Sequence, residues 1–182
     1  ISGLDHYESA FRDSQMKDSK DKVFLAWLEQ SEKNADKTPS ASSLAGADLA
    51  SFERGKVMFH GAATCFGCHG ADGEGMPNLG PPLNESQWVT GKPETLVKIL
   101  LHGMTGPVEV NKEIYTPVAD MPGLAMNPAM TDQALADLAT YIRNVWSNHA
   151  PPVSAELIQK QRELGKNRAG RPWTAKELTT AR

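Results

Sequence analysis

CFGCH, the segment formed by Cys65, Phe66, Gly67, Cys68 and His69, carries the clearest chemical pattern in the chain. A Cys-x-x-Cys-His spacing is typical of haem attachment, in which two thiols add to the haem vinyl groups and the adjacent histidine binds iron. On one tight helical turn, the two sulfur atoms face one edge of the macrocycle and the next residue projects under its face. The segment therefore predicts one covalent haem c on Cys65 and Cys68, with His69 on the iron.

Two other uses of a cysteine pair fit this sequence less well. A thioredoxin-like redox site would need the pair at the start of a helix in a β-α-β unit, and no strand pattern supplies such a unit. A structural zinc site would need four ligands, and no second pair of cysteine or histidine residues lies at ligand spacing. Haem attachment is the preferred interpretation.

The composition is that of a globular protein with one hydrophobic core. The 182 residues are 40% hydrophobic and 23% charged, and no stretch approaches the roughly 20 continuous apolar residues that span a bilayer. The net charge is −3, with an excess of acidic side chains at 51–150 and of basic ones at 151–182. We expect no transmembrane segment and no nucleic-acid partner. The basic tail is expected to fold back on the acidic body, and the alternative is that it forms a docking patch for a partner.

The chain divides into three predicted parts. Residues 1–46 are expected to form an N-terminal helical extension, with one helix at about 20–33 and a small, polar linker at 38–46. Residues 47–150 form the predicted main domain, which contains CFGCH. Residues 151–182 are expected to form a basic C-terminal tail with two short helices.

Capping residues and apolar periodicity place the helices. One core helix is expected from Asp48 to about His60, and a second begins at Pro93 and ends at Gly103. The other predicted caps are Thr131 for the last core helix, Ser154 for the first tail helix, and Thr174 with Glu177 for the second. No segment shows the alternation typical of strands, so the prediction is an all-α fold with irregular loops at 70–92 and 104–130.

Over residues 47–149 the chain resembles the class I cytochrome c family. The resemblance rests on the order of CFGCH, a Gly/Pro-rich loop, an Asp-Met-Pro triplet at 120–122 and a final helix with TYIRNVW at 140–146. It implies three to four core helices around one haem, and a hydrogen bond from the His69 ring to Pro81, which follows Gly80. The residues implied at the crossing of the first and last helices are Gly55, Phe59, Leu138 and Tyr141.

The iron of an electron carrier needs a second axial ligand, and a methionine thioether favours the reduced metal. The resemblance implies Met121, because the family places a Met-Pro ligand in the extended loop before the final helix. Met126 in the same loop is the alternative methionine, whereas Met104 and Met130 are expected to pack. His102, at the end of a predicted buried helix, stays open as a nitrogen ligand.

Trp88 and Tyr115 are further candidates for haem contacts. Each combines an apolar ring with one hydrogen-bond donor, so each could line the haem and donate to a propionate. Packing alone explains both residues equally well.

The resemblance implies electron transfer by a low-spin haem with His69 and Met121 as ligands, and not enzymatic catalysis. GEGMPNLGPPL (73–83), QWVTG (87–91), ILLHG (99–103) and MTGP (104–107) also resemble cytochrome domains of bacterial quinoprotein and other membrane-associated dehydrogenases. This narrower resemblance implies a dehydrogenase as electron donor, a cytochrome or oxidase as acceptor, and a periplasmic or extracytoplasmic location. The alternative is a haem enzyme or gas sensor with an open sixth iron position.

Overall fold

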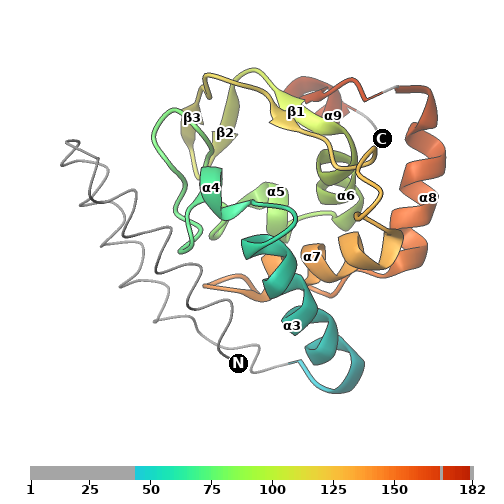
Figure 1. Ribbon diagram of the computed structural model, residues 1–182. Coiled ribbons are helices and arrows are strands. Elements are labelled where there is room, and N and C mark those ends of the chain that lie inside the picture. Colours follow the sequence, from blue (N-terminus) through green and yellow to red (C-terminus); the bar gives the residue numbers. More distant parts are fainter. Residues whose placement is uncertain (1–43, 169, 181–182) are drawn as a thin grey trace, which may run out of the picture.

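The computed structural model describes residues 44–168 and 170–180 (Figure 1). The predicted helix at 20–33 and most of the linker lie outside these residues. The helices described are α3 (Gly46–His60), α4 (Phe66–His69), α5 (Gln87–Thr90), α6 (Pro93–His102), α7 (Asp132–Asn144), α8 (Ala155–Gly165) and α9 (Ala175–Thr180). The strands are β1 (Gly103–Thr105), β2 (Val108–Val110), β3 (Glu113–Tyr115), β4 (Met121–Pro122) and β5 (Trp173–Thr174), and a 3₁₀ turn (Lys166–Arg168) follows α8.

The helices predicted within the described residues are present, and their caps form as expected. The Thr131 hydroxyl accepts a hydrogen bond from the Ala134 N–H at 3.2 Å, and the Ser154 side chain caps α8 in the same way. At α9, Glu177 Oε2 accepts from the Thr174 N–H at 2.9 Å, and Thr174 Oγ1 accepts from the Glu177 N–H at 3.2 Å. These ends were predictable because each cap lies within three residues of its partner.

The two longest core helices, α3 and α7, cross in contact at Gly55. A Cβ atom at Gly55 would lie 2.0 Å from the carbonyl oxygen of Asp137 and 2.6 Å from Cβ of Tyr141, so only glycine permits this approach. The ring of Phe59 packs with its centroid 5.4 Å from that of Tyr141, and Leu138 is fully buried. The crossing implied by the sequence is therefore present.

The expectation of a chain without strands is wrong at 103–122 and at 173–174. β1 is the central strand of a three-stranded sheet, with β4 antiparallel on one side and β5 parallel on the other. Gly103, with φ of 80°, ends α6 and allows the chain to turn directly into β1. The fold is therefore helical in its core, with small sheets in the segments that were predicted as loop.

β2 and β3 form a separate two-stranded hairpin. Asn111 and Lys112 at its tip both have positive φ, as a two-residue type I′ turn requires. Val108 and Val110 are buried while Glu109 between them is exposed. This short alternation is the sequence signal that the prediction missed.

The C-terminal tail packs on the body of the molecule. α8 lies against α6 and α7, and Ile158 on α8 is fully buried (Figure 1). Arg162 donates hydrogen bonds to the Asp132 carboxylate at 2.8 Å and to the carbonyl oxygens of Ala125 and Met130 at 2.9 and 3.0 Å. Apolar burial, the Arg162 hydrogen bonds and the pairing of β5 with β1 join the basic tail to the body. None of the described helices has the length and apolar character needed to cross a membrane.

Candidate functional site

The CFGCH segment forms one helical turn that begins at Cys65. The N–H of His69 donates to the carbonyl of Cys65 at 3.0 Å, and the N–H of Gly70 donates to that of Phe66 at 2.9 Å. Both cysteines are free thiols; Cys65 is partly buried and Cys68 is exposed. One turn therefore carries two thiols that no disulfide occupies, directly followed by the His69 ring.

A hydrogen bond to Pro81 holds the ring of His69. Its Nδ1 lies 2.8 Å from the carbonyl oxygen of Pro81. Because a carbonyl only accepts, Nδ1 must carry the proton, and Nε2 is left with its lone pair. His69 is buried, and burial lowers its pKa in spite of the opposing hydrogen bond to Pro81. A neutral imidazole with a fixed tautomer is the form that binds a metal.

The loop from Gly70 to Pro81 can reach His69 only because Gly80 has no side chain. A Cβ at Gly80 would lie 2.7 Å from the carbonyl oxygen of Cys68 and 3.1 Å from Nδ1 of His69. The structure thus brings Cys65, Cys68 and His69 together on one turn and places Pro81 against His69, a contact that the family resemblance implied. Gly80 sets the distance between the loop and the helical turn.

The chemistry of Cys65 differs from that of a redox-active thiol. Burial raises its pKa to about 12, whereas thioredoxin-like exchange needs a thiolate of depressed pKa. No group of three or more potential metal-ligating side chains occurs among residues 44–168 and 170–180, so nothing there supports a zinc site. Both rival uses of the cysteine pair lack support from the structure.

Met121 lies in β4, opposite Met104 of β1. It is partly buried and packs against the same hydrophobic cluster as Cys65. The alternative methionine, Met126, is 84% exposed, and Met130 is buried in the core as expected. Met104 on β1 is also partly buried, so burial sets Met121 apart from Met126 and Met130 but not from Met104.

The donors of Trp88 and Tyr115 are occupied by protein groups. The indole N–H of Trp88 donates to the carbonyl of Glu109 at 2.8 Å, and the hydroxyl of Tyr115 donates to the Glu113 carboxylate at 3.0 Å. These contacts fix the rings against the β2–β3 hairpin. Their predicted contact with a haem stays a prediction.

His102 is buried at the end of α6 and faces the tail. A Cβ at Gly165 of α8 would lie 2.2 Å from its Nε2, and the ring of Trp173 lies 6.5 Å away, centroid to centroid. Burial lowers the pKa of His102, and the charges of Arg168 and Arg162 add to this effect. The expected hydrogen bonds of a core histidine are absent, because neither ring nitrogen has a partner among the described residues.

Trp146 and Asn148 support the loop that follows His69, a role that the sequence did not reveal. The indole N–H of Trp146 donates to the carbonyl of Ala71 at 3.1 Å, and its ring fills the space above Gly73. Asn148 donates to the carbonyl of Leu83 at 3.0 Å and accepts from the Glu85 N–H at 2.8 Å. TYIRNVW contains this tryptophan, but periodicity alone does not indicate which loop it contacts.

Comparisons with known proteins agree with this geometry. The family model described as Cytochrome c matches residues 52–146. Cytochrome c-552 of Thermus thermophilus is 30% identical over 128 residues, which cover 65% of this chain and 80% of that protein. The cytochrome c subunit of a quinone alcohol dehydrogenase from Gluconobacter oxydans is 35% identical over 112 residues, 60% of this chain. A fructose dehydrogenase cytochrome subunit from Gluconobacter japonicus is 29% identical over 137 residues, 70% of this chain. The matches span only 22% and 27% of the lengths of these two subunits.

Proposed function

The chain belongs to the cytochrome c family, and on that premise we propose that Cys65 and Cys68 hold its haem c through thioether bonds, with His69 on the iron. A member of this family is an electron carrier and not an enzyme, and its cofactor is covalently bound haem c. The bound group supplies an iron that cycles between its ferrous and ferric forms. The residues of this chain attach that group, orient its ligands and exclude water from it.

The single observation that carries the proposal is the hydrogen bond from Nδ1 of His69 to Pro81. It leaves Nε2 as the free lone pair, it fixes the plane of the ring, and it increases the basicity of the ligand. The two free thiols precede this ring on the same turn, so the residues present match the donor set of covalent haem c. Pro81 accordingly acts as a positioning residue.

Met121 is the proposed second axial ligand. Its support is its place on β4, its partial burial and its packing against the cluster that Cys65 also contacts. A thioether beside a neutral imidazole would give a low-spin iron with both axial positions filled. His69 and Met121 would hold the iron and the surrounding residues would exclude water, while the bound group would supply the electron exchange.

The partners are proposed from the relatives. Several relatives are named as cytochrome subunits of dehydrogenases, which favours a dehydrogenase as electron donor and a cytochrome or oxidase as acceptor. Haem attachment of this type is completed outside the cytoplasmic membrane in bacteria, so a periplasmic or extracytoplasmic location is part of the same proposal.

The test is the near-infrared absorption of the oxidised holoprotein beside Met121→Ala and Met126→Ala variants. The proposal expects a sulfur-to-iron charge-transfer band in the parent, its loss in Met121→Ala, and its persistence in Met126→Ala, because Met126 is 84% exposed. A parent without the band, or one whose reduced form binds carbon monoxide at once, would contradict the His/Met assignment. The haem enzyme or gas sensor would then become the better interpretation.

A further inference from the structure

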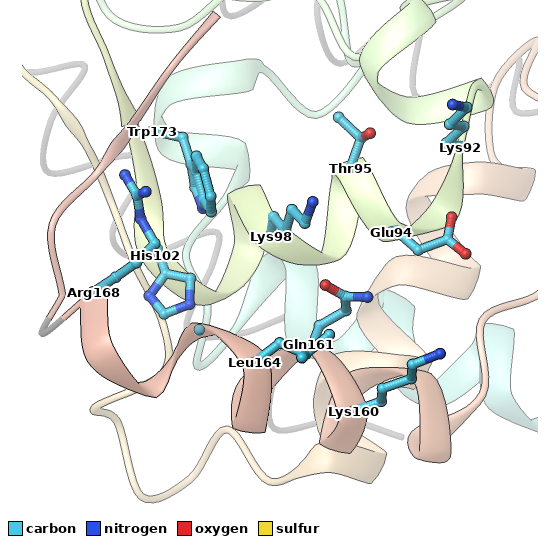
Figure 2. Close-up of a pocket in the computed structure, with 11 residues that line it drawn as sticks. Lys92, Glu94, Thr95, Lys98, His102, Lys160, Gln161, Leu164, Arg168 and Trp173 are labelled. Carbon is cyan, nitrogen blue, oxygen red and sulfur yellow. The ribbon is translucent and has the colours of Figure 1, made fainter. Parts of the chain in front are cut away.

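A groove separate from the proposed haem site lies between α6, α8 and the segment that leads into β5 (Figure 2). Its volume is about 670 Å³, within the range of small-molecule sites. We refer to it as the α6–α8 groove. Four cationic side chains line it, with Glu94 as the one carboxylate among its described lining residues; the cations are Lys92, Lys98, Lys160 and Arg168.

The positive charge of the groove is poorly neutralised. Lys92, Lys98 and Lys160 take no part in the ion pairs found among the described residues. Arg168 differs from the lysines, because it donates hydrogen bonds to the carbonyls of Arg171 at 3.1 Å and Pro172 at 2.9 Å and lies 3.6 Å from Glu177. Its guanidinium carbon lies 3.3 Å from the centre of the Trp173 ring. Nζ of Lys98 lies 5.6 Å from the centre of the same ring, so two cations converge on one aromatic side chain.

The groove also collects buried polar atoms that lack hydrogen-bond partners in the described part of the chain. They are both ring nitrogens of His102, Oε1 of Gln161 and Nε1 of Trp173. His102 and Gln161 are only 5% and 6% exposed. Buried polar groups in folded proteins are almost always hydrogen-bonded. All three residues line the groove, but the unpartnered atoms themselves are buried, so a partner that enters from the groove reaches them only after a lining side chain moves.

We propose that the α6–α8 groove binds a small organic anion that carries carboxylate or phosphate groups beside a hydroxyl. The lysine and arginine side chains match the negative groups, and the Trp173 N–H and one nitrogen of His102 supply further donors. Oε1 of Gln161 can only accept a hydrogen bond, and it therefore requires a donor such as a hydroxyl. Binding moves the Lys98 side chain, which lies over the Trp173 ring and makes no ion pair among the described residues, whereas Arg168 stays bonded to the carbonyls of Arg171 and Pro172.

This inference goes beyond electron transfer, because none of the lining residues belongs to the proposed haem site. It also gives His102 a role other than iron ligation. A long acidic peptide is less favoured than a small anion, because the unpartnered atoms of His102, Gln161 and Trp173 are buried, whereas the surface of the groove is formed by its lysine side chains.

The test is calorimetric titration of the holoprotein with citrate at about 0.15 M salt, where weak surface attraction is screened. Citrate is expected to bind at one site, and Lys98→Gln to weaken it about tenfold through loss of one charged hydrogen bond. The control is Lys56→Gln, an exposed lysine of α3 outside the groove, which should bind like the parent. Glycerol 3-phosphate, with a phosphate and hydroxyls, shows which kind of anionic group is preferred.

A comparison of two ligands tests whether a ligand hydroxyl donates to Oε1 of Gln161. Tricarballylate has the carboxylates of citrate without its hydroxyl, so the parent should prefer citrate and Gln161→Leu should lose that preference. In ¹⁵N spectra of the reduced protein, citrate should shift the Nε1 signal of Trp173. The proposal is overturned by absence of binding for all three anions, by equal weakening in Lys56→Gln and Lys98→Gln, or by hexaglutamate binding more tightly than citrate.

Discussion

Met121 and Trp173 lie on opposite sides of one residue, Met104, in the three-stranded sheet β4–β1–β5. The proposed iron ligand and the start of the C-terminal strand are therefore separated in space by one strand, β1, although they are far apart in the sequence. β5 covers the edge of β1 that would otherwise be open. The tail thus contributes to the support of the loop that carries Met121.

Replacing Thr174 by alanine should weaken this support. The Thr174 hydroxyl makes two of the three hydrogen bonds that join Thr174 to Glu177 at the start of α9, and loss of such a cap costs about 1 kcal/mol. We expect lower stability in urea and faster binding of added imidazole to the iron, because the sheet around Met121 opens more often. Thr179→Ala is the control, since its hydroxyl bonds only to carbonyls of α9. Equal imidazole rates in both variants would argue against a connection between the tail and Met121.

Gly55→Ala should destabilise the protein by about 3 kcal/mol. The new Cβ would overlap the carbonyl of Asp137, and backbone atoms on both helices would have to move apart. Lys56→Ala is the control, because it also places an alanine in α3, one residue along, where the side chain is exposed. Urea unfolding of both holoproteins checks the difference. Similar midpoints for the two variants would show that the α3–α7 contact is looser than described.

The parts of the molecule that could be predicted from sequence are those set by local chemistry. Thr131 and Thr174 satisfy N–H groups within three residues, so their helices begin where the residues indicate. The CFGCH turn is equally local. The approach of Pro81 to His69 was implied only by the family resemblance, since spacing in sequence does not show which loop folds back.

The strands were missed for two different reasons. β1, β4 and β5 are two or three residues long, and β1 and β5 pair across a long separation, so no periodic pattern marks them. The β2–β3 hairpin, by contrast, has buried Val108 and Val110 around exposed Glu109. A proline- and glycine-rich neighbourhood obscured that alternation. The groove was not predictable either, because it depends on how α8 packs on α6.

Asp137→Asn should change how stability depends on pH. Burial acts to raise the pKa of Asp137, but hydrogen bonds from Arg54, Ser51 and Gln133 outweigh it and hold this pKa below its usual value. A carboxyl with a depressed folded pKa stabilises the protein above its unfolded pKa of about 3.9. That contribution is lost as the pH falls through the folded value.

We therefore expect the free energy of unfolding of Asp137→Asn to be about 2 kcal/mol lower than that of the parent at neutral pH. Below about pH 4, the stability of this variant should fall less steeply with decreasing pH than that of the parent. Urea midpoints measured from pH 7 to pH 2.5 give both curves. Asp48→Asn, in the exposed first turn of α3, is the control and should follow the parent. A pH profile of Asp137→Asn parallel to that of the parent would remove Asp137 from the acid transition.

Arg143→Lys should destabilise the protein as much as shortening a buried apolar side chain would, although it keeps the positive charge. Arg143 is 1% exposed and donates to three carbonyls, those of Val89 at 2.5 Å, Gly91 at 3.1 Å and Pro151 at 2.8 Å. These bonds tie α7 to α5 and to the start of the tail. The ammonium group of lysine cannot reproduce the planar arrangement of N–H donors in the guanidinium group, so at least one of these buried carbonyls is left without a donor.

Arg143→Lys should lower the free energy of unfolding by about 3 kcal/mol. The near-infrared band of the folded protein should be unchanged, because Met121 is held by other elements. Arg171→Lys is the control, since its side chain is 70% exposed and contacts only Glu177 at 3.5 Å among the described ion pairs. Thermal unfolding of both holoproteins tests the predicted loss of stability, and their absorption spectra test whether the near-infrared band persists. A loss of the band in Arg143→Lys at temperatures where the helices persist would show that α7 anchors the Met121 loop through Arg143, and that the sheet β4–β1–β5 is not sufficient.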